Sequence, residues 1–506
     1  MKTIYAKFVL SLLAFSVTSA CTGDFEEYNK NPNELEIGKT APVNLLPNIL
    51  YSGGSGLLRQ TYQMNGELIQ YTVSSNTTDA YHRYQISNGV TAGIWDLLAR
   101  WASNADHMID LCEDQEEKCN FKAIGLTLRA FYMQMLTDIW GDVPFFEAFE
   151  GREGNFKPKF DSQRAIYLQL IADLEEANGL YDNKFPFSST QKVKDLLYGG
   201  DLDKWRRFSN SLLLRILLRV SARDDADLQI ATRMQRIFDD PAAWPVFDSE
   251  ENAAILRFSG ESPFLNPYGS MSDTNFSGAG RRACIQLITM LDTFGDPRLS
   301  IYFRQNAGMW NGAISGEASR DESGSSEAAY LRKAVLGEYT SPYSFMNYDE
   351  VLFIWAEAAQ RGLIAGGDAL AQEYYARAVE ASIRHWSANP GNSKAVSESA
   401  IEQYIKKVEY DGSYEQLMNQ KYLALFWVGF EAWSEYRRTG YPLLTISKST
   451  MNDHILPRRF QYPINTAKTN PDNYRTAVEN LIRDYNGNDD MKTPVWWSKK
   501  GIEQKK

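Results

Sequence analysis

Apolar residues recur at helical spacing along most of the chain. One amphipathic stretch spans 201–220, and Asp201 can cap its first turn. The residues on its apolar face are Trp205, Phe208, Leu212, Leu213, Ile216, Leu217 and Val220. A second stretch covers 348–361 and ends at Gly362, and a third follows at about 368–386. Because two helices within about 36 residues match the length of a tetratricopeptide hairpin, the pattern predicts helix pairs.

Similar amphipathic stretches cover much of the remaining sequence. They lie near residues 44–70, 92–112, 121–140, 163–180 and 415–437. The alternation of apolar and polar residues that is typical of half-buried strands is scarce. The pattern therefore predicts an all-α fold in which any β-structure is minor.

Two segments interrupt the helical pattern. Residues 261–280 and 305–327 are rich in Gly, Ser and Asn, and both are longer than ordinary connections between helices. Long irregular loops in a compact protein are commonly functional or disordered. We therefore expect a loop-rich insert at about 255–345 within a single body that spans 43–506.

The N-terminus has the features of a secretory signal peptide. Two lysines flank the start of an apolar run, Phe8–Val17, which is too short to cross a bilayer because a spanning helix needs about 20 residues. Small residues directly before Cys21 predict a bacterial lipobox, although Thr18 stands where Leu is usual. We expect residues 1–20 to be removed and Cys21 to carry the lipid. The alternative is a plain signal peptide with a chance cysteine nearby.

The composition of the segment 21–42 predicts an acidic tether. It contains Asp24, Glu26 and Glu27, followed by Asn, Pro and Lys. Two or three fatty chains on Cys21 would hold stably in a membrane, since each buried methylene contributes about 0.8 kcal/mol. No later segment is apolar enough to span a bilayer, so the sequence predicts a protein anchored to the membrane through its N-terminal lipid.

Charge and motif content narrow the possible functions. The chain has 53 Lys and Arg against 64 Asp and Glu, a formal charge of −11, which argues against nucleic acid because phosphate binding needs clustered positive charge. Phosphate-loop, zincin and serine-hydrolase motifs are absent, and the four histidines lack metal-ligand spacing. We expect no metal or other cofactor and no catalytic residues. Paired carboxylates could still support glycoside hydrolysis, because the sequence does not show whether a pair faces across a cleft.

A series of short strings occurs along the chain in a definite order. The strings are TDIWGDVPFFEA at 137–148, YGGDLDKW at 198–205, NSLLLRILLR at 210–219, DPRL at 296–299, FIWAEAA at 353–359, QKY at 420–422, EAWSEYRRTGYP at 431–442, PRRFQYP at 457–463 and a Trp pair at 496–497. In this order, behind a lipobox, they closely resemble the SusD/RagB family of nutrient-binding outer-membrane lipoproteins. The resemblance extends over essentially the whole mature chain.

The resemblance implies both a fold and a role. It implies about four tetratricopeptide-like helical hairpins with an irregular, loop-rich second lobe. It also implies a protein that binds rather than cleaves, and that covers a SusC-like TonB-dependent barrel, to which it delivers oligosaccharides or, in the RagB branch, peptides. The acidic residues after Cys21 resemble the export signal that sends such lipoproteins to the cell exterior; the alternative is a linker that is merely soluble.

Ligand contacts are expected on loops. Sugar rings present apolar C–H faces that stack on Trp or Tyr, and their hydroxyls pair with amide, carboxylate or guanidinium groups. Trp310 lies outside any helical period, the stretch 76–84 combines both residue types, and members of the family tend to draw site residues from these two regions. The predicted ligand-binding residues are Trp310, Tyr81, Tyr84, Asn76 and Asp79. The alternative for Trp310 is packing beneath its own loop.

Other aromatic and basic motif residues are expected to be structural. Trp140, Trp205, Trp355 and Trp433 lie on helical apolar faces, which predicts core positions. The arginines expected to form ion pairs within or between helices are Arg215, Arg219, Arg437 and Arg438. A phosphate or carboxylate site is the alternative for these arginines.

The sequence thus predicts a lipid-anchored surface protein of the outer membrane that captures oligosaccharide or another nutrient for a SusC-like TonB-dependent transporter. Three alternatives remain open at this point. They are a surface glycoside hydrolase, a peptide-binding RagB-type subunit, and a scaffold that binds a protein partner through its hairpin faces.

Overall fold

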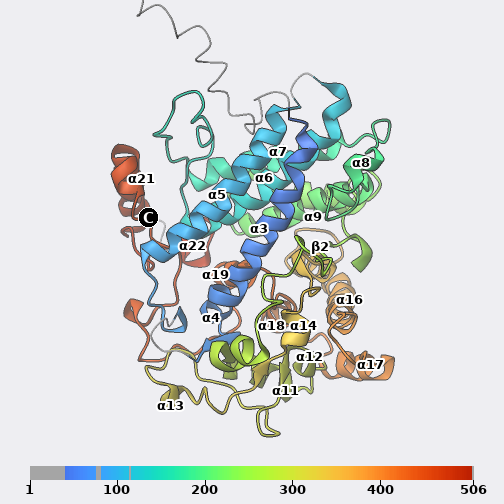
Figure 1. The fold of residues 1–506 in the computed structure, drawn as a ribbon, viewed down its shortest axis with the longest axis vertical. Coiled ribbons are helices and arrows are strands. Elements are labelled where there is room, and N and C mark those ends of the chain that lie inside the picture. Colours follow the sequence, from blue (N-terminus) through green and yellow to red (C-terminus); the bar gives the residue numbers. More distant parts are fainter. Residues whose placement is uncertain (1–39, 76–80, 113–114, 504–506) are drawn as a thin grey trace, which may run out of the picture.

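The computed structural model describes residues 40–75, 81–112 and 115–503, and its body consists mainly of helices (Figure 1). The predicted signal peptide, Cys21 and nearly all of the predicted tether lie outside the described residues. No helix in the described part is both long and apolar enough to cross a membrane.

The main helices are separated by connections that range from a few residues to the irregular region 240–347. They are α3 (Leu46–Gln60), α5 (Asn88–Asp110), α6 (Cys119–Trp140), α7 (Gln163–Leu180), α9 (Leu202–Val220), α10 (Ile230–Asp239), α15 (Tyr348–Gln360), α16 (Gly367–Ser387), α17 (Glu398–Lys407), α18 (Tyr414–Ala424), α19 (Glu431–Thr439) and α21 (Pro471–Tyr485). Shorter helices are α4 (Gly66–Leu68), α8 (Ser189–Lys192), α11 (Ile285–Thr293), α12 (Leu299–Tyr302), α13 (Arg320–Ser323), α14 (Lys333–Leu336), α20 (Thr466–Thr469) and α22 (Lys499–Glu503).

The helices pair as tetratricopeptide-like hairpins, which confirms the predicted fold class. The pairs are α5 with α6, α7 with α9, α15 with α16, and α18 with α19, and each pair is in contact. Local signals set several boundaries as predicted. The Asp201 carboxylate accepts the backbone N–H of Lys204 and so caps α9, and Gly362, with a φ of 68°, lies just beyond the end of α15.

The stretch near 415–437 differs from its prediction as one amphipathic segment. The structure divides it into α18 and α19, joined by residues 425–430. Trp427 in this connection has a φ of 71°, a left-handed conformation that a continuous right-handed helix cannot contain. The break is favourable because it allows the connection to bury its apolar side chains in the core.

Strands are few and short, as predicted. One antiparallel sheet has the order β1 (Thr72–Ser74), β3 (Arg281–Ala283), β5 (Tyr330–Leu331) and β4 (Phe303–Arg304). The second sheet pairs β2 (Ala254–Leu256) with β6 (Tyr343–Met346). Except for β1, every strand comes from 254–346, the region where the sequence predicts an irregular insert. The first sheet therefore ties that region to the N-terminal helices through β1.

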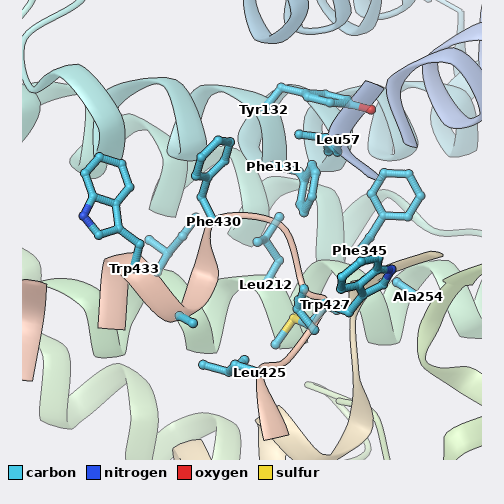
Figure 2. Close-up of a cluster of buried hydrophobic side chains, with 14 of the residues drawn as sticks. Leu57, Phe131, Tyr132, Leu212, Ala254, Phe345, Leu425, Trp427, Phe430 and Trp433 are labelled. Carbon is cyan, nitrogen blue, oxygen red and sulfur yellow. The ribbon is translucent and has the colours of Figure 1, made fainter. Parts of the chain in front are cut away.

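The core lies between the helical hairpins and the second sheet. Figure 2 shows Trp427 and Phe430, from the connection between α18 and α19, together with Phe131 of α6 and Phe345 of β6. The motif tryptophans Trp140, Trp205, Trp355 and Trp433 are all buried, which confirms their predicted structural role.

A network of buried ion pairs crosses the core between hairpins. Arg219 of α9 binds Glu431 and Glu435 of α19, the latter at 2.7 Å. Arg438 contacts Glu357 of α15 at 2.6 Å and Glu435 at 2.6 Å. The network therefore links three separate helices through groups that are almost fully withdrawn from solvent.

The two remaining motif arginines, Arg215 and Arg437, have different kinds of partner. Arg215 of α9 binds Glu350 of α15 at 2.6 Å, so Arg215, Arg219 and Arg438 are ion-paired as predicted. Arg437 differs because it is held mainly by oxygen acceptors that carry no charge. Its guanidinium donates to the backbone carbonyls of Asp138 and Arg458, at 2.5 and 3.1 Å.

We predict that Arg219→Met destabilises the protein by about 3–5 kcal/mol, because the change leaves the buried carboxylates of Glu431 and Glu435 without their shared cation. Urea unfolding followed by circular dichroism measures the change. The control is Arg384→Met, which removes the exposed pairs to Glu380 and Glu398 and should leave the midpoint nearly unchanged. Equal effects of the two substitutions would contradict a structural role for the network.

Candidate functional site

Three loops far apart in sequence meet at one surface, which we call the loop surface: residues 81–86, 305–329 and 443–456. The first two loops join at His82. The His82 Nδ1 accepts the backbone N–H of Gly316 at 3.0 Å, and its carbonyl accepts the hydroxyl of Ser315 at 3.4 Å. Burial lowers the pKa of His82 to about 4, so the ring is neutral at physiological pH and Nδ1 is free to accept.

The third loop closes the junction. The backbone N–H of Met451 donates to the carbonyl of Arg83 at 2.7 Å, and the Arg83 guanidinium donates to the carbonyl of Ser449 at 3.2 Å. The carboxylate of Glu317 accepts the hydroxyl of Ser447 at 2.9 Å. Each loop is therefore bonded to the others, mostly through the side chains of His82, Arg83 and Glu317.

The buried carboxylate of Glu67 holds the first loop of the loop surface in place. It lies in α4, is fully buried, and accepts the backbone N–H of His82 at 2.8 Å. The guanidinium of Arg281 lies 3.1 Å from the same carboxylate. Burial raises the pKa of Glu67 to about 7, against the opposing attraction of Arg281 and the backbone N–H donors of His82 and Tyr81. The segment that carries Tyr81 is thus held by a carboxyl group that titrates near neutrality.

The first sheet supports the loop that carries Trp310. The ring of Tyr330 in β5 has the guanidinium carbons of Arg282 and Arg304 each 3.8 Å from its centroid. Two guanidinium groups at this distance must occupy opposite faces of the ring, which fixes β5 between β3 and β4. Next to β5, the N–H of Ala329 donates to the carbonyl of Asn311 at 2.7 Å. Trp310 therefore belongs to a segment fastened to the sheet.

The predicted ligand residues differ in where they lie and in how far they are exposed. Trp310 and Tyr81 both lie on loops of this surface, and each is partly buried against the core. Tyr84 is only 1% exposed and has a φ of 59°, so its ring belongs to the core and is not presented to a ligand here. We correct that assignment: the polar stretch around Tyr84 gave no sign that the chain turns inward there. Asn76 and Asp79 lie outside the described residues.

The structure also identifies features of the loop surface that sequence reasoning missed. Met309 is 57% exposed, and Ile314 and Met451 are exposed to a similar degree. Large apolar side chains that a fold leaves exposed on loops are candidates for contact with a ligand, because solvent disfavours them. Their exposure depends on contacts distant in sequence, so no local sequence signal could have revealed it.

The chemistry of the loop surface suits binding. It combines a tryptophan, a tyrosine and exposed apolar side chains with hydroxyl and amide groups. Within the described ranges, no group of three His, Cys, Asp or Glu side chains converges as metal ligands would. Together, the stack of hairpins and the surface made of loops define a helical-repeat protein of the ligand-binding class.

Comparison with known proteins places the chain within this class. Residues 32–463 match the model of the SusD-like family, described as starch-binding and associating with the outer membrane. The chain therefore belongs to the SusD-like family, as its ordered motifs predict. Searching the curated proteins gave no match.

Solved structures share the same fold over nearly their full length. A SusD homologue from Parabacteroides distasonis ATCC 8503 is 22% identical, with a TM-score of 0.74, and 91% of this chain and 98% of that chain align. A SusD homologue from Bacteroides fragilis NCTC 9343 is 22% identical, with a TM-score of 0.71 and coverage of 89% and 99%. A chitin-binding SusD homologue from Flavobacterium johnsoniae is 21% identical, with a TM-score of 0.72 and coverage of 90% and 98%. At these identities the likeness establishes the fold.

The raised pKa of Glu67 predicts a specific pH dependence of stability. Since its pKa rises from an ordinary 4.5 to about 7 on folding, the protonated carboxyl stabilises the folded state below about pH 4.5, and this contribution is lost as the pH rises through 7. Relative to Glu67→Gln, which cannot titrate, the wild type should lose about 3 kcal/mol of unfolding free energy across that interval.

Urea unfolding at several pH values between about 5 and 8 measures this difference. The control is Glu153→Gln, which changes an exposed carboxylate and should give the same difference from wild type at every pH. A wild-type to Glu67→Gln difference that is constant with pH would show that Glu67 titrates normally.

Proposed function

We propose that this protein is a cell-surface lipoprotein that captures oligosaccharides and delivers them to a SusC-like TonB-dependent transporter of the outer membrane. The observation that carries the proposal is the match to the SusD-like family over residues 32–463, with a fold that aligns along nearly the whole length of solved SusD homologues. The starch-binding description of that family and the chitin-binding homologue favour a carbohydrate over a peptide ligand.

The proposal assigns capture to the loop surface and to no catalytic group. Trp310 supplies an aromatic face for a sugar ring, and Tyr81 lies on the neighbouring loop that Glu67 holds in place. Hydroxyl and amide groups on the same loops can pair with sugar hydroxyls. A surface fixed by hydrogen bonds between loops needs little reorganisation when a ligand binds, which favours affinity.

We predict that Trp310→Ala weakens binding of the cognate oligosaccharide by about three- to ten-fold, the loss expected for one aromatic stacking contact. Isothermal titration calorimetry against maltooligosaccharides, chitooligosaccharides and short peptides measures it. Chromatography of the same mixtures detects any cleavage, which would favour the hydrolase alternative.

The matched control is Trp244→Ala. Trp244 is also partly buried, but it lies beneath the guanidinium of Arg236 of α10, at 4.2 Å from the ring centroid, and belongs to none of the three loops. Its replacement should leave the affinity unchanged. Equal affinities of wild type and Trp310→Ala for a true ligand would remove Trp310 from the site, and tight binding of peptides alone would favour the RagB-type alternative.

We further predict that Cys21 carries the lipid and that the lipidated protein associates with a barrel transporter. Metabolic labelling with a radioactive fatty acid should mark the wild type and leave Cys21→Ser unlabelled, because acylation needs the thiol. A barrel protein should co-purify with the lipidated wild type from detergent-solubilised outer membranes. Unlabelled wild type would leave the plain signal peptide as the explanation of residues 1–20.

A further inference from the structure

A second concave site lies at the C-terminal end of α11. It is a cleft of about 440 Å³ between α11, the end of α17 and one face of α18, which we call the α11 cleft. This volume falls within the range of about 300–1,000 Å³ that is usual for small-molecule sites. Figure 1 places α11 and α17 at the same end of the molecule as α13, which belongs to the loop surface.

The walls of the α11 cleft are rich in uncharged hydrogen-bonding groups, and two of its glutamines are already engaged. Gln420 accepts from Arg298 and donates to the hydroxyl of Tyr404, both at 3.0 Å. Gln416 accepts the N–H of Asp411 and donates to the carbonyl of Glu409, both at 2.9 Å. These amides make the walls rigid and are not available to a ligand.

Asn419 is different from the two glutamines. Its side chain lines the α11 cleft, its Oδ1 is buried, and no group in the described part of the chain donates a hydrogen bond to it. A buried carbonyl oxygen without a donor is unfavourable. Because Asn419 as a whole is only half-buried, a rotation of its side chain would present this oxygen to the cleft, where a ligand hydroxyl or N–H group can pair with it. The hydroxyls of Thr289 and Thr293 line the opposite wall.

An aromatic ring completes the lining of the α11 cleft. Phe294 is 46% exposed, directly after the last residue of α11. A phenyl ring at the mouth of an amide-lined cleft offers a face to the C–H groups of a sugar, while the cleft offers partners to its hydroxyls. The charged lining residues Lys407, Asp411 and Glu415 are all exposed to solvent, which screens them.

Two other surface clefts have linings of a different character. One, of about 420 Å³, has four carboxylates in its lining, from Asp106, Asp110, Glu150 and Glu153. The other, of about 330 Å³, has four cationic side chains in its lining, from Arg437, Arg458, Lys499 and Lys500. The α11 cleft differs from both because its lining combines uncharged amides and hydroxyls with an exposed phenyl ring and has no such concentration of one charge.

The α11 cleft is connected to the loop surface along one helix. The N-terminus of α11 contacts the Trp310 loop, where the N–H of Ile285 donates to the carbonyl of Ala313 at 2.8 Å. Ile285, Thr289 and Thr293 are exposed at intervals of four residues and so share one face of α11. A nine-residue helix is about 13 Å long, which exceeds one sugar ring and is within reach of a short oligosaccharide.

We propose that the α11 cleft is a second sugar-binding subsite, in which a neutral sugar unit donates a hydroxyl to Asn419 Oδ1 and packs against Phe294. One extended oligosaccharide then contacts both the Trp310 loop and the cleft along the exposed face of α11. The inference rests on the proposed function, because it takes the ligand to be a neutral oligosaccharide.

The first test is crystallographic. Crystals of the mature protein are soaked separately in maltotriose and in triacetylchitotriose, and the α11 cleft is inspected for sugar. Sugar with a hydroxyl within hydrogen-bonding distance of Asn419 Oδ1 supports the proposal. A cleft without sugar in both soaks overturns it, whether or not the loop surface is occupied.

The second test uses oligosaccharide length. Phe294→Ala and Asn419→Ala should each weaken binding of a hexasaccharide by about three- to ten-fold and change binding of a disaccharide by less than about two-fold. The control, Phe146→Ala, removes another exposed phenylalanine, one that lines the acidic cleft, and should change neither affinity. A length-independent effect, or none, overturns the proposal.

The two proposals fail in different ways. Sugar in the α11 cleft together with unchanged affinity of Trp310→Ala would refute the assignment of the loop surface and retain the subsite. A loss of oligosaccharide affinity in Trp310→Ala, together with an α11 cleft that holds no sugar, would refute the subsite and retain the proposed function.

Discussion

The buried ion network between hairpins is the interaction on which the architecture depends. Burial alone would raise the pKa of Glu435, but Arg438, Lys421 and Arg219 outweigh it and hold that pKa well below its usual range. The same balance applies to Glu357: burial alone would raise its pKa, but Arg438 outweighs this effect and the pKa is lowered to about 2. Such groups are stable only when every partner is in place, because an unpaired buried charge costs several kcal/mol. The network therefore permits one mutual arrangement of α9, α15, α18 and α19.

A rigid helical stack allows loops to carry the binding chemistry. The loop surface is held by hydrogen bonds between segments more than 200 residues apart, such as the one from the Gly316 N–H to the His82 side chain. Its foundations are Glu67 in α4 and the ring of Tyr330 between two arginines. Loops on a rigid scaffold can vary without disturbing the helices beneath them, which is how one fold serves different ligands.

The α11 helix relates the two proposed contact regions. Its N-terminus is bonded to the Trp310 loop through Ile285, and its C-terminal end forms a wall of the cleft that contains Asn419. Two separated contacts on one rigid helix favour a ligand long enough to reach both, since the second contact then forms without a further loss of translational freedom. A protein that captures polymer fragments outside a cell gains selectivity for length from such an arrangement.

The sequence by itself determined most of the helices, the pairing of 348–361 with 368–386, and the buried faces. The cap at Asp201, the stop at Gly362 and the core tryptophans follow from contacts within a few residues, which periodicity reports directly. Only the tertiary structure decided that Tyr84 turns inward and that Asn419 Oδ1 has no donor among the described residues. The physical reason is that exposure and hydrogen bonding in loops depend on segments distant in sequence, and no local pattern encodes which segments meet.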